Sequence, residues 1–279
     1  INILTEIPTD VLKTALDMEE RSHVEIEDNY IFVVINIPAL RGSDSYDTVP
    51  LGIFLTPDFF ITVCLEETEV LYPFINNVVS TFYTYKKTRF RCQILYRTAT
   101  LFLRYLQQIN RRTDDIEVHL RHSTRNRDFF QLLELQKSMT YFSSALRTNG
   151  TVMDRLLRLR GHQSMRHLLK MYEEDEDLLE DVIIENKQAI EMVEMYTNIL
   201  MNMMNAFTSV ISNNLNEVMK LLAALTIILS VPTIIFSLWG TNVTLPFAES
   251  GAIGFVEVIL IAIVCTIIAM VAMWKRDLF

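Results

Sequence analysis

Two long apolar segments near the C-terminus constrain this 279-residue chain more than any other feature. The first covers residues 221–239 and the second covers residues 252–274, and Gly240, Thr241 and Asn242 directly follow the first. A helix rises about 1.5 Å per residue and the hydrocarbon core of a bilayer is about 30 Å thick, so each segment is long enough to span it. The sequence therefore predicts a helical hairpin in a membrane.

Basic residues predict the orientation of this hairpin. Lys220 precedes the first segment, Lys275 and Arg276 follow the second, and residues 243–251 contain neither Lys nor Arg. By the positive-inside rule, residues 240–251 form an extracellular loop and residues 275–279 a cytoplasmic basic tail. We therefore expect a multi-pass protein of the cell membrane, in contact with lipid, whose N- and C-termini are both cytoplasmic.

The first part of the chain mixes strand and helix signals. Short β-branched or aromatic runs predict strands at residues 24–26, 30–37, 51–55 and 59–65. The turn residues Thr56, Pro57 and Asp58 predict a hairpin between the last two of these strands. Apolar residues then recur at helical spacing over residues 67–86 and 90–122. We expect residues 1–125 to form a cytoplasmic α/β domain.

Long helices are expected from there to the membrane, because no proline lies between Pro73 and Pro232. Residues 126–172 are expected to form a helical pair, with helices at 128–147 and 152–172 and a turn at Thr148, Asn149 and Gly150.

The next helix is expected to begin in an acidic cluster, Glu173–Asp181, because carboxylates are favourable at a helix N-terminus. Nothing interrupts the helical pattern from there to Trp239 except Pro232, so residues 173–220 form a stalk that continues into the first span, residues 221–239. A stalk of this length carries more apolar surface than a small domain covers. Self-association is therefore expected.

Composition and motifs exclude several functions. The net charge of −9 argues against nucleic acid as a partner, because nucleic-acid binding requires a basic surface. The sequence contains no phosphate-binding loop, no nucleophile elbow and no His-Glu pair at the spacing of metalloproteases. We expect a protein that is not an enzyme and that binds no organic cofactor.

The first span carries four hydroxyl side chains at spacings of 4, 3 and 4, namely Thr226, Ser230, Thr233 and Ser237. This spacing places them on one helical face, which extends back through Leu222, Met219 and Asn216. Small hydroxyl residues commonly pack membrane helices together, and they also line water-filled pores. Asn242 at the end of the stripe favours a pore.

These residues resemble the CorA family of divalent-cation channels. The resemblance rests on Asn216–Lys220, the proline-containing span, the Gly-x-Asn motif Gly240-Thr241-Asn242, the short acidic turn and a second span that ends in basic residues. The family usually has Met at the middle position of that motif, where this chain has Thr241. The resemblance implies a homopentameric funnel with an axial pore, in which each first span lines the pore and the Asn242 ring receives a hydrated cation.

The resemblance also implies residue roles. The pore-facing set would be Asn216, Met219, Leu222, Thr226, Ser230, Thr233 and Ser237, with Met219 and Leu222 as an apolar constriction. Asp181 would share regulatory Mg²⁺ with a neighbouring subunit, for which Glu66, Glu67 and Asp58 are candidate partner acids. Glu249 in the loop would attract cations to the outer mouth.

The leading hypothesis is thus a channel for hydrated divalent cations, chiefly Mg²⁺ with Co²⁺ or Ni²⁺ as further ions, which intracellular Mg²⁺ gates. Mg²⁺ dehydrates reluctantly, so neutral oxygen dipoles that bond its water shell suit its passage. The alternative is a Zn²⁺ transporter similar to the ZntB branch of the family, with coupling to protons, since the middle motif residue there also departs from Met. A third reading, a membrane-anchored signalling coiled coil, predicts no pore and no flux.

Overall fold

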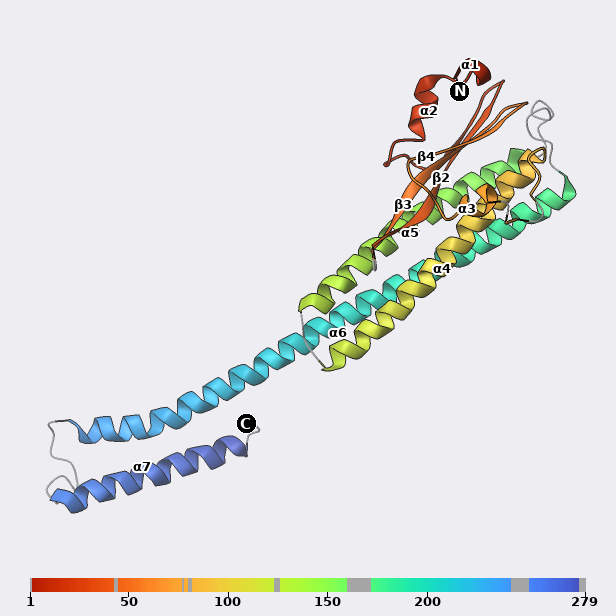
Figure 1. Ribbon diagram of the computed structural model, residues 1–279. Helices are drawn as coiled ribbons and strands as arrows, with labels where there is room; N and C mark the ends of the chain where they lie inside the picture. Colours follow the sequence, from red (N-terminus) through yellow and green to blue (C-terminus); the bar gives the residue numbers. More distant parts are fainter. Residues whose placement is uncertain are drawn as a thin grey trace. The chain divides into compact units, whose positions relative to one another are not determined.

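The computed structural model describes residues 2–42, 45–76, 78–79, 82–122, 126–159, 172–241 and 251–275 (Figure 1). The chain divides into two compact units, residues 1–205 and 206–279. The helix α6 (Glu173–Trp239) runs without a break through the boundary between them. It begins at the first residue of the acidic cluster and ends at Trp239, as the sequence predicts.

The first unit contains a four-stranded antiparallel sheet with the order β1-β2-β3-β4. Its strands are β1 (His23–Ile26), β2 (Ile31–Arg41), β3 (Ser45–Leu55) and β4 (Phe60–Cys64). All four predicted strands and the predicted β3–β4 hairpin are confirmed. β2 and β3 are longer than predicted, because they pair from Ile31 with Leu55 as far as Arg41 with Ser45.

Both faces of this sheet are covered. Alternate residues of β2 and β3, including Val33, Ile35 and Ile53, join the main core with α4 (Lys87–His122) and α5 (Asn126–Arg158). The opposite face carries Phe32 and Phe54, whose rings stack 4.2 Å apart between centroids. Two short helices near the N-terminus, α1 (Asn2–Thr5) and α2 (Thr9–Thr14), were not predicted from the sequence. Residues of α2 and the residues next to it cover the face of the sheet that carries Phe32 and Phe54.

Two helix predictions are wrong. Residues 67–86 do not form a long helix, because their described part contains only the four-residue helix α3 (Tyr72–Ile75) and turns. The predicted turn at Thr148, Asn149 and Gly150 lies inside α5, which is one continuous helix, so residues 126–158 are not a helical pair with a break there.

Packing explains why turn-forming residues occur inside α5. Asn149 is fully buried, and its side-chain amide pairs with the backbone of Asn36 on β2: its Nδ2 donates to the carbonyl oxygen of Asn36 at 2.7 Å and its Oδ1 accepts from the Asn36 amide at 2.9 Å. Gly150 allows close approach of α6, since a Cβ there would lie 3.1 Å from Nδ2 of Asn186. Asn186 in turn donates to the carbonyl oxygen of Leu146 at 3.0 Å.

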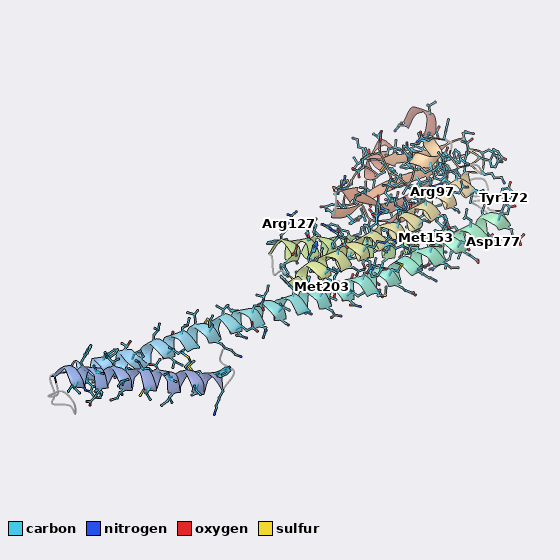
Figure 2. The ribbon with its side chains drawn as sticks, turned by 60° about the horizontal axis from the view of Figure 1, so that its bottom comes forward. Arg97, Arg127, Met153, Tyr172, Asp177 and Met203 are labelled. Atoms are coloured by element: carbon cyan, nitrogen blue, oxygen red, sulfur yellow. The ribbon has the colours of Figure 1, made fainter. Side chains whose placement is uncertain are left out.

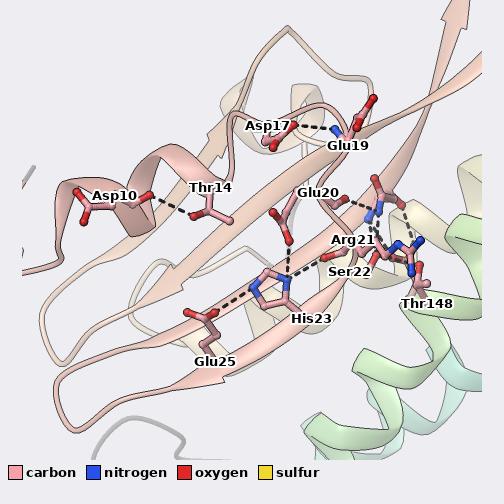
Figure 3. Close-up of polar contacts among 12 residues, drawn as sticks. Asp10, Thr14, Asp17, Glu19, Glu20, Arg21, Ser22, His23, Glu25 and Thr148 are labelled. Carbon is pink, nitrogen blue, oxygen red and sulfur yellow. Dashed lines mark hydrogen bonds and ion pairs between the residues drawn. The ribbon is translucent and has the colours of Figure 1, made fainter.

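Ser22, just before β1, completes this polar junction. Its hydroxyl donates to Oδ1 of Asn149 at 2.7 Å and accepts from the hydroxyl of Thr148 at 3.2 Å (Figure 3). The sheet, α5 and the first half of α6 are thereby joined by directional hydrogen bonds as well as by apolar packing.

The first half of α6 buries much of its own apolar stripe inside the first unit. Leu179, Val182, Val193 and Leu200 are buried there, and Figure 2 shows this part of α6 beside α4 and α5. The expectation that self-association must cover the whole stalk is therefore too broad.

The second unit consists of the rest of α6 and α7 (Gly251–Trp274). Both helices contain segments long and apolar enough to cross a membrane, and few of these residues are buried. This exposure is the pattern that spans surrounded by lipid require.

Candidate functional site

The hydroxyl stripe lies on α6 in the second unit. Thr226, Thr233 and Ser237 are exposed and Ser230 is half-buried. Three of the hydroxyls donate hydrogen bonds to carbonyl oxygens four residues back, from Thr226 to Leu222 at 2.8 Å, from Ser230 to Thr226 at 2.7 Å and from Thr233 to Leu229 at 2.8 Å. These protons are thus committed to the helix, so the lone pairs of the oxygens are the groups that face outward.

α7 lies against a different face of α6. One face of α6 is covered: Ala224 is buried there, and Ile228, Val231, Ile235 and Trp239 are half-buried. On α7 the buried positions include Val258, Ala262 and Met273, and the figures show α7 alongside this half of α6. Successive residues turn by about 100°, so the centre of the hydroxyl stripe is roughly half a turn from the centre of the α7-facing side.

The hydroxyl stripe therefore points away from α7, with Ser230 nearest the covered region. Packing within one chain does not explain the four hydroxyls. The part of the stripe nearer the N-terminus is also uncovered: Asn216 is exposed, and Met219 and Leu222 expose 57% and 54% of their surface. Two large apolar side chains so exposed are stabilised by a further apolar surface, which lipid or other copies of α6 can supply.

Thr241 closes the last turn of α6. Its hydroxyl donates to the carbonyl oxygen of Leu238 at 2.7 Å, and its amide donates to the same oxygen at 3.3 Å. The amide of Gly240 donates to the carbonyl oxygen of Phe236 at 3.0 Å. Asn242 and Glu249, which the sequence assigns to the outer mouth, lie outside the described residues.

The candidate regulatory acids are separate in one chain. Asp181 is exposed on α6, and Asp58 and Glu67 are exposed in the first unit. Among the residues that the structure describes, no three His, Cys, Asp or Glu side chains are arranged to hold a metal ion.

Two of the candidate partner acids already have basic neighbours. Oε2 of Glu66 lies 2.6 Å from Nη1 of Arg41, and this bond raises the pKa of Arg41. Burial lowers the pKa of Lys87, and the nearby carboxylate of Asp58 opposes that shift.

The acidic cluster contains a buried contact that the sequence did not reveal. Asp175 lies in this cluster and is buried, with 2% of its surface exposed. Its Oδ1 lies 3.8 Å from Nη1 of Arg89 on α4, and its Oδ2 accepts from the amide of Tyr172. Asp175 thus anchors the N-terminus of α6 to α4. Spacing could not reveal this contact, because Arg89 is more than 80 residues away.

These features define a class. An α/β unit, one uninterrupted helix that continues into a membrane-length apolar segment, and a second such helix on the face opposite the hydroxyls together describe a two-span membrane transport protein.

The family follows from comparison with known proteins. The family model described as CorA-like Mg²⁺ transporter protein matches residues 2–276, and the chain belongs to this family. It is accordingly a transporter of divalent cations and not an enzyme. The cobalt/magnesium transport protein CorA of Methanocaldococcus jannaschii is 24% identical over 249 residues, which cover 86% of this chain and 74% of that protein.

Solved structures share the fold. The complete structure of the CorA magnesium transporter from M. jannaschii superposes with a TM-score of 0.84 at 23% identity, over 99% of this chain and 85% of that one. The cytoplasmic domain of ZntB from Vibrio parahaemolyticus gives a TM-score of 0.57 at 11% identity, over 77% of this chain and 82% of that one. The resemblance that the motifs indicated is confirmed, and so is the predicted fold class of an α/β domain, a long helix and two apolar helices.

Proposed function

We propose that this chain assembles as a homopentamer in the cell membrane and conducts hydrated divalent cations, chiefly Mg²⁺, through an axial pore lined by α6. Both termini lie in the cytoplasm and residues 240–251 lie outside. Co²⁺ is a further candidate ion, as the name of the M. jannaschii relative suggests.

The observation that carries this proposal is the direction of the hydrogen bonds that the hydroxyls on α6 make. Thr226, Ser230 and Thr233 donate their protons to their own helix, so they present lone pairs on the face that α7 leaves uncovered. Water bound to a cation turns its oxygen toward the ion and its hydrogens outward. Such a water shell donates hydrogen bonds, and a wall of acceptors matches it.

Neutral acceptors also suit passage better than charges. Mg²⁺ holds its water shell tightly, so a pore that bonds the shell avoids the cost of removing it. A ring of carboxylates would bind the ion strongly, whereas hydroxyl and amide dipoles permit release. In this proposal Asn242 supplies the amide oxygens at the outer mouth, with Glu249 as an attractor, and Met219 and Leu222 form an apolar constriction that closes by excluding water.

We infer that intracellular Mg²⁺ closes the pore through Asp181. Carboxylates from neighbouring copies repel each other unless a cation lies between them, so loss of Mg²⁺ would loosen that interface. Of the three candidate partners, Glu66 is already neutralised by Arg41 and Asp58 lies near Lys87. Glu67, which is exposed and has no ion pair with any described residue, is the partner that we favour.

The test is ion flux into proteoliposomes that contain the purified protein, with Mg²⁺, Co²⁺, Ni²⁺ or Zn²⁺ outside and with or without a pH gradient. We expect Mg²⁺ uptake without a pH gradient, and Asn242→Ala should abolish it while the oligomer stays intact in cross-linking. Uptake by the Asn242→Ala variant at the parent rate, or a cross-linked ladder that ends at a dimer, would contradict the proposal.

A second candidate function is Zn²⁺ transport coupled to protons. Thr241 favours it, because this residue departs from the Met that is usual in the magnesium branch. In the same flux measurement this function predicts Zn²⁺ uptake that increases with a pH gradient and little uptake of Mg²⁺.

Regulation needs a separate measurement. Asp181→Asn should raise the Mg²⁺ concentration that protects the protein from limited proteolysis, and Glu67→Gln should act in the same direction. Glu180→Gln, an exposed neighbour on α6, is the matched control. Protection that is identical in Asp181→Asn and the parent would remove Asp181 from the mechanism.

A further inference from the structure

A cavity of about 400 Å³ opens beside α3 and α4 in the first unit. Its volume falls within the range of sites for small molecules, and most of its lining is apolar. The polar groups that reach it are Glu69, Arg97, Thr100 and Arg104. None of the residues proposed for the pore or for regulation lines it, so the proposed function gives it no role.

Two arginines give this cavity a positive wall. Arg97 and Arg104 are seven residues apart on α4, which places them on one helical face about 10 Å apart along the axis. Such a pair is notable in a chain of net charge −9.

The donors of Arg97 are available to a ligand. Its guanidinium carbon lies 5.3 Å from the centre of the Phe74 ring, and Phe74 is 5% exposed (Figure 2 labels Arg97 on α4). Stacking on an aromatic ring uses the face of a guanidinium and leaves its N–H groups free in the plane. Within the described part of the chain, Arg97 has no ion pair with a carboxylate. A fixed cation with free donors is a site for an anion.

Glu69 reduces this positive charge only in part. One of its oxygens lies 3.6 Å from Nη1 of Arg104, and the other accepts from the hydroxyl of Tyr105 at 2.9 Å. Burial, and after it the bond to Glu69, raises the pKa of Tyr105, so this hydroxyl keeps its proton at neutral pH. Glu69 is thus held by an internal donor beside Arg104, and the lining keeps an excess of one positive charge.

Aromatic rings complete the cavity. Tyr72 and Tyr96 line it and expose 65% and 39% of their surface. An exposed tyrosine ring offers a flat apolar face on which a planar ligand stacks. Thr100 lies between the two arginines, and its hydroxyl donates to the carbonyl oxygen of Tyr96, so it presents lone pairs to the cavity.

We propose that this cavity binds a nucleotide, whose phosphate groups pair with Arg97 and Arg104 and whose base stacks on Tyr72 or Tyr96. Guanidinium groups pair with phosphate oxygens through two parallel hydrogen bonds, which neither water nor chloride replaces equally well. The size of the cavity, its two separated cations and its aromatic rim together favour this class over a simple inorganic anion.

The experiment is isothermal titration calorimetry of the full-length protein in detergent, with EDTA present so that no Mg²⁺ complex forms. ATP, inorganic tripolyphosphate and adenosine are the three probes. We expect ATP to bind most tightly. Arg104→Gln and Arg97→Gln should each weaken ATP binding about tenfold, which is the usual worth of a charged hydrogen bond. At least one of Tyr72→Ala and Tyr96→Ala should weaken ATP binding, and both should leave tripolyphosphate binding unchanged.

Arg111→Gln is the matched control, because Arg111 is an exposed arginine one further step of seven along α4 and does not line the cavity. Arg104 is more than half exposed, so its replacement leaves the core intact even if that of Arg97 does not.

ATP binding that is equal in the parent and in Arg104→Gln would overturn the proposal. Binding of tripolyphosphate as tight as that of ATP would also overturn it, and so would an absence of ATP binding at millimolar concentration. No ion flux is measured here, so either result leaves the proposed transport function standing.

Discussion

The hydroxyl of Thr241 donates a 2.7 Å hydrogen bond to the carbonyl oxygen of Leu238, at the point where α6 ends and the Gly-x-Asn segment begins. A methionine at this position would have no such donor and would present a flexible thioether instead. The residue that departs from the usual motif therefore terminates the helix by a bond that the usual residue cannot make.

This bond leads to a prediction about selectivity. Thr241→Met removes the hydroxyl donor and leaves the Leu238 carbonyl oxygen with only the longer bond from the backbone amide of residue 241, so it should change the ratio of Mg²⁺ to Zn²⁺ flux in proteoliposomes without loss of the fold. In a magnesium channel it should raise Mg²⁺ flux, and in a zinc carrier it should leave Zn²⁺ flux level or lower it. Thr241→Ser keeps the hydroxyl and should behave as the parent. If both variants match the parent for both ions, position 241 does not set selectivity.

The hydroxyl stripe makes a second prediction. Thr226→Val and Thr233→Val keep the shape of the side chain and remove its oxygen, so each should lower divalent-cation flux severalfold, because the water shell loses an acceptor. The control is Thr266→Val on α7, where the hydroxyl also bonds a carbonyl oxygen four residues back, that of Ala262. Flux should fall in the α6 variants and not in the α7 variant; an equal effect on both helices would show that the stripe has only a structural role.

Arg89 has two acidic partners, and the shorter of the two contacts is not expected to stabilise the protein more. Its ion pair with Glu174 is the shorter, at 2.8 Å, but the Glu174 side chain is 75% exposed. Its contact with Asp175 is 3.8 Å, and the Asp175 side chain is 3% exposed. Exposed ion pairs contribute little to stability, whereas contacts of a buried carboxylate contribute more. Loss of Asp175 also removes the hydrogen bond that its Oδ2 accepts from the amide of Tyr172.

We therefore predict that Asp175→Ala lowers the free energy of unfolding by about 2 kcal/mol or more, and Glu174→Ala by less than about 1 kcal/mol. Thermal unfolding followed by circular dichroism would measure the order of the two. A larger effect for Glu174→Ala would show that the shorter bond matters more.

A side chain at Gly52 on β3 would clash with a neighbouring side chain, and a second substitution can remove that clash. A Cβ at this position would lie 2.4 Å from Cβ of Ala15 and 3.3 Å from Cε2 of Phe32. Gly52→Ala should therefore cost about 1–3 kcal/mol of stability through displacement of the segment that follows α2.

The double variant Gly52→Ala with Ala15→Gly removes the clash and should recover much of the lost melting temperature. The single variant Ala15→Gly measures the cost of that substitution by itself, because Gly52 makes no clash in it. Failure of the double variant to exceed Gly52→Ala would show that the cost arises from the backbone at Gly52.

Local pattern was sufficient to predict the strands, the β3–β4 hairpin and the continuity of α6. Alternation, β-branched residues and the absence of proline act within a few residues of each other, so they are visible in sequence. The length of β2 and β3 was not predictable in this way, because Pro38 and Pro50 indicate breaks and only the pairing of the two strands overrides them.

The break wrongly predicted inside α5 has a physical cause. Asn149 and Gly150 are turn-forming residues by local preference, but Asn36 and Asn186 from distant segments determine their role. Similarly, the spacing of the hydroxyls shows that they share a face of α6, but only packing shows which face α7 covers. Contacts between distant residues are absent from any local pattern.

The pairing of Asn149 with Asn36 also bears on aggregation. β1 covers β2 only from Ile31 to Val34, so beyond that point β2 has an open edge on which the strand of another molecule could add. The side chain of Asn149 satisfies both the amide and the carbonyl of Asn36, as a peptide group of a neighbouring strand would. A single amide on α5 thus blocks that edge, and newly made chains in which α5 has not yet docked should be the ones most prone to associate through their sheets.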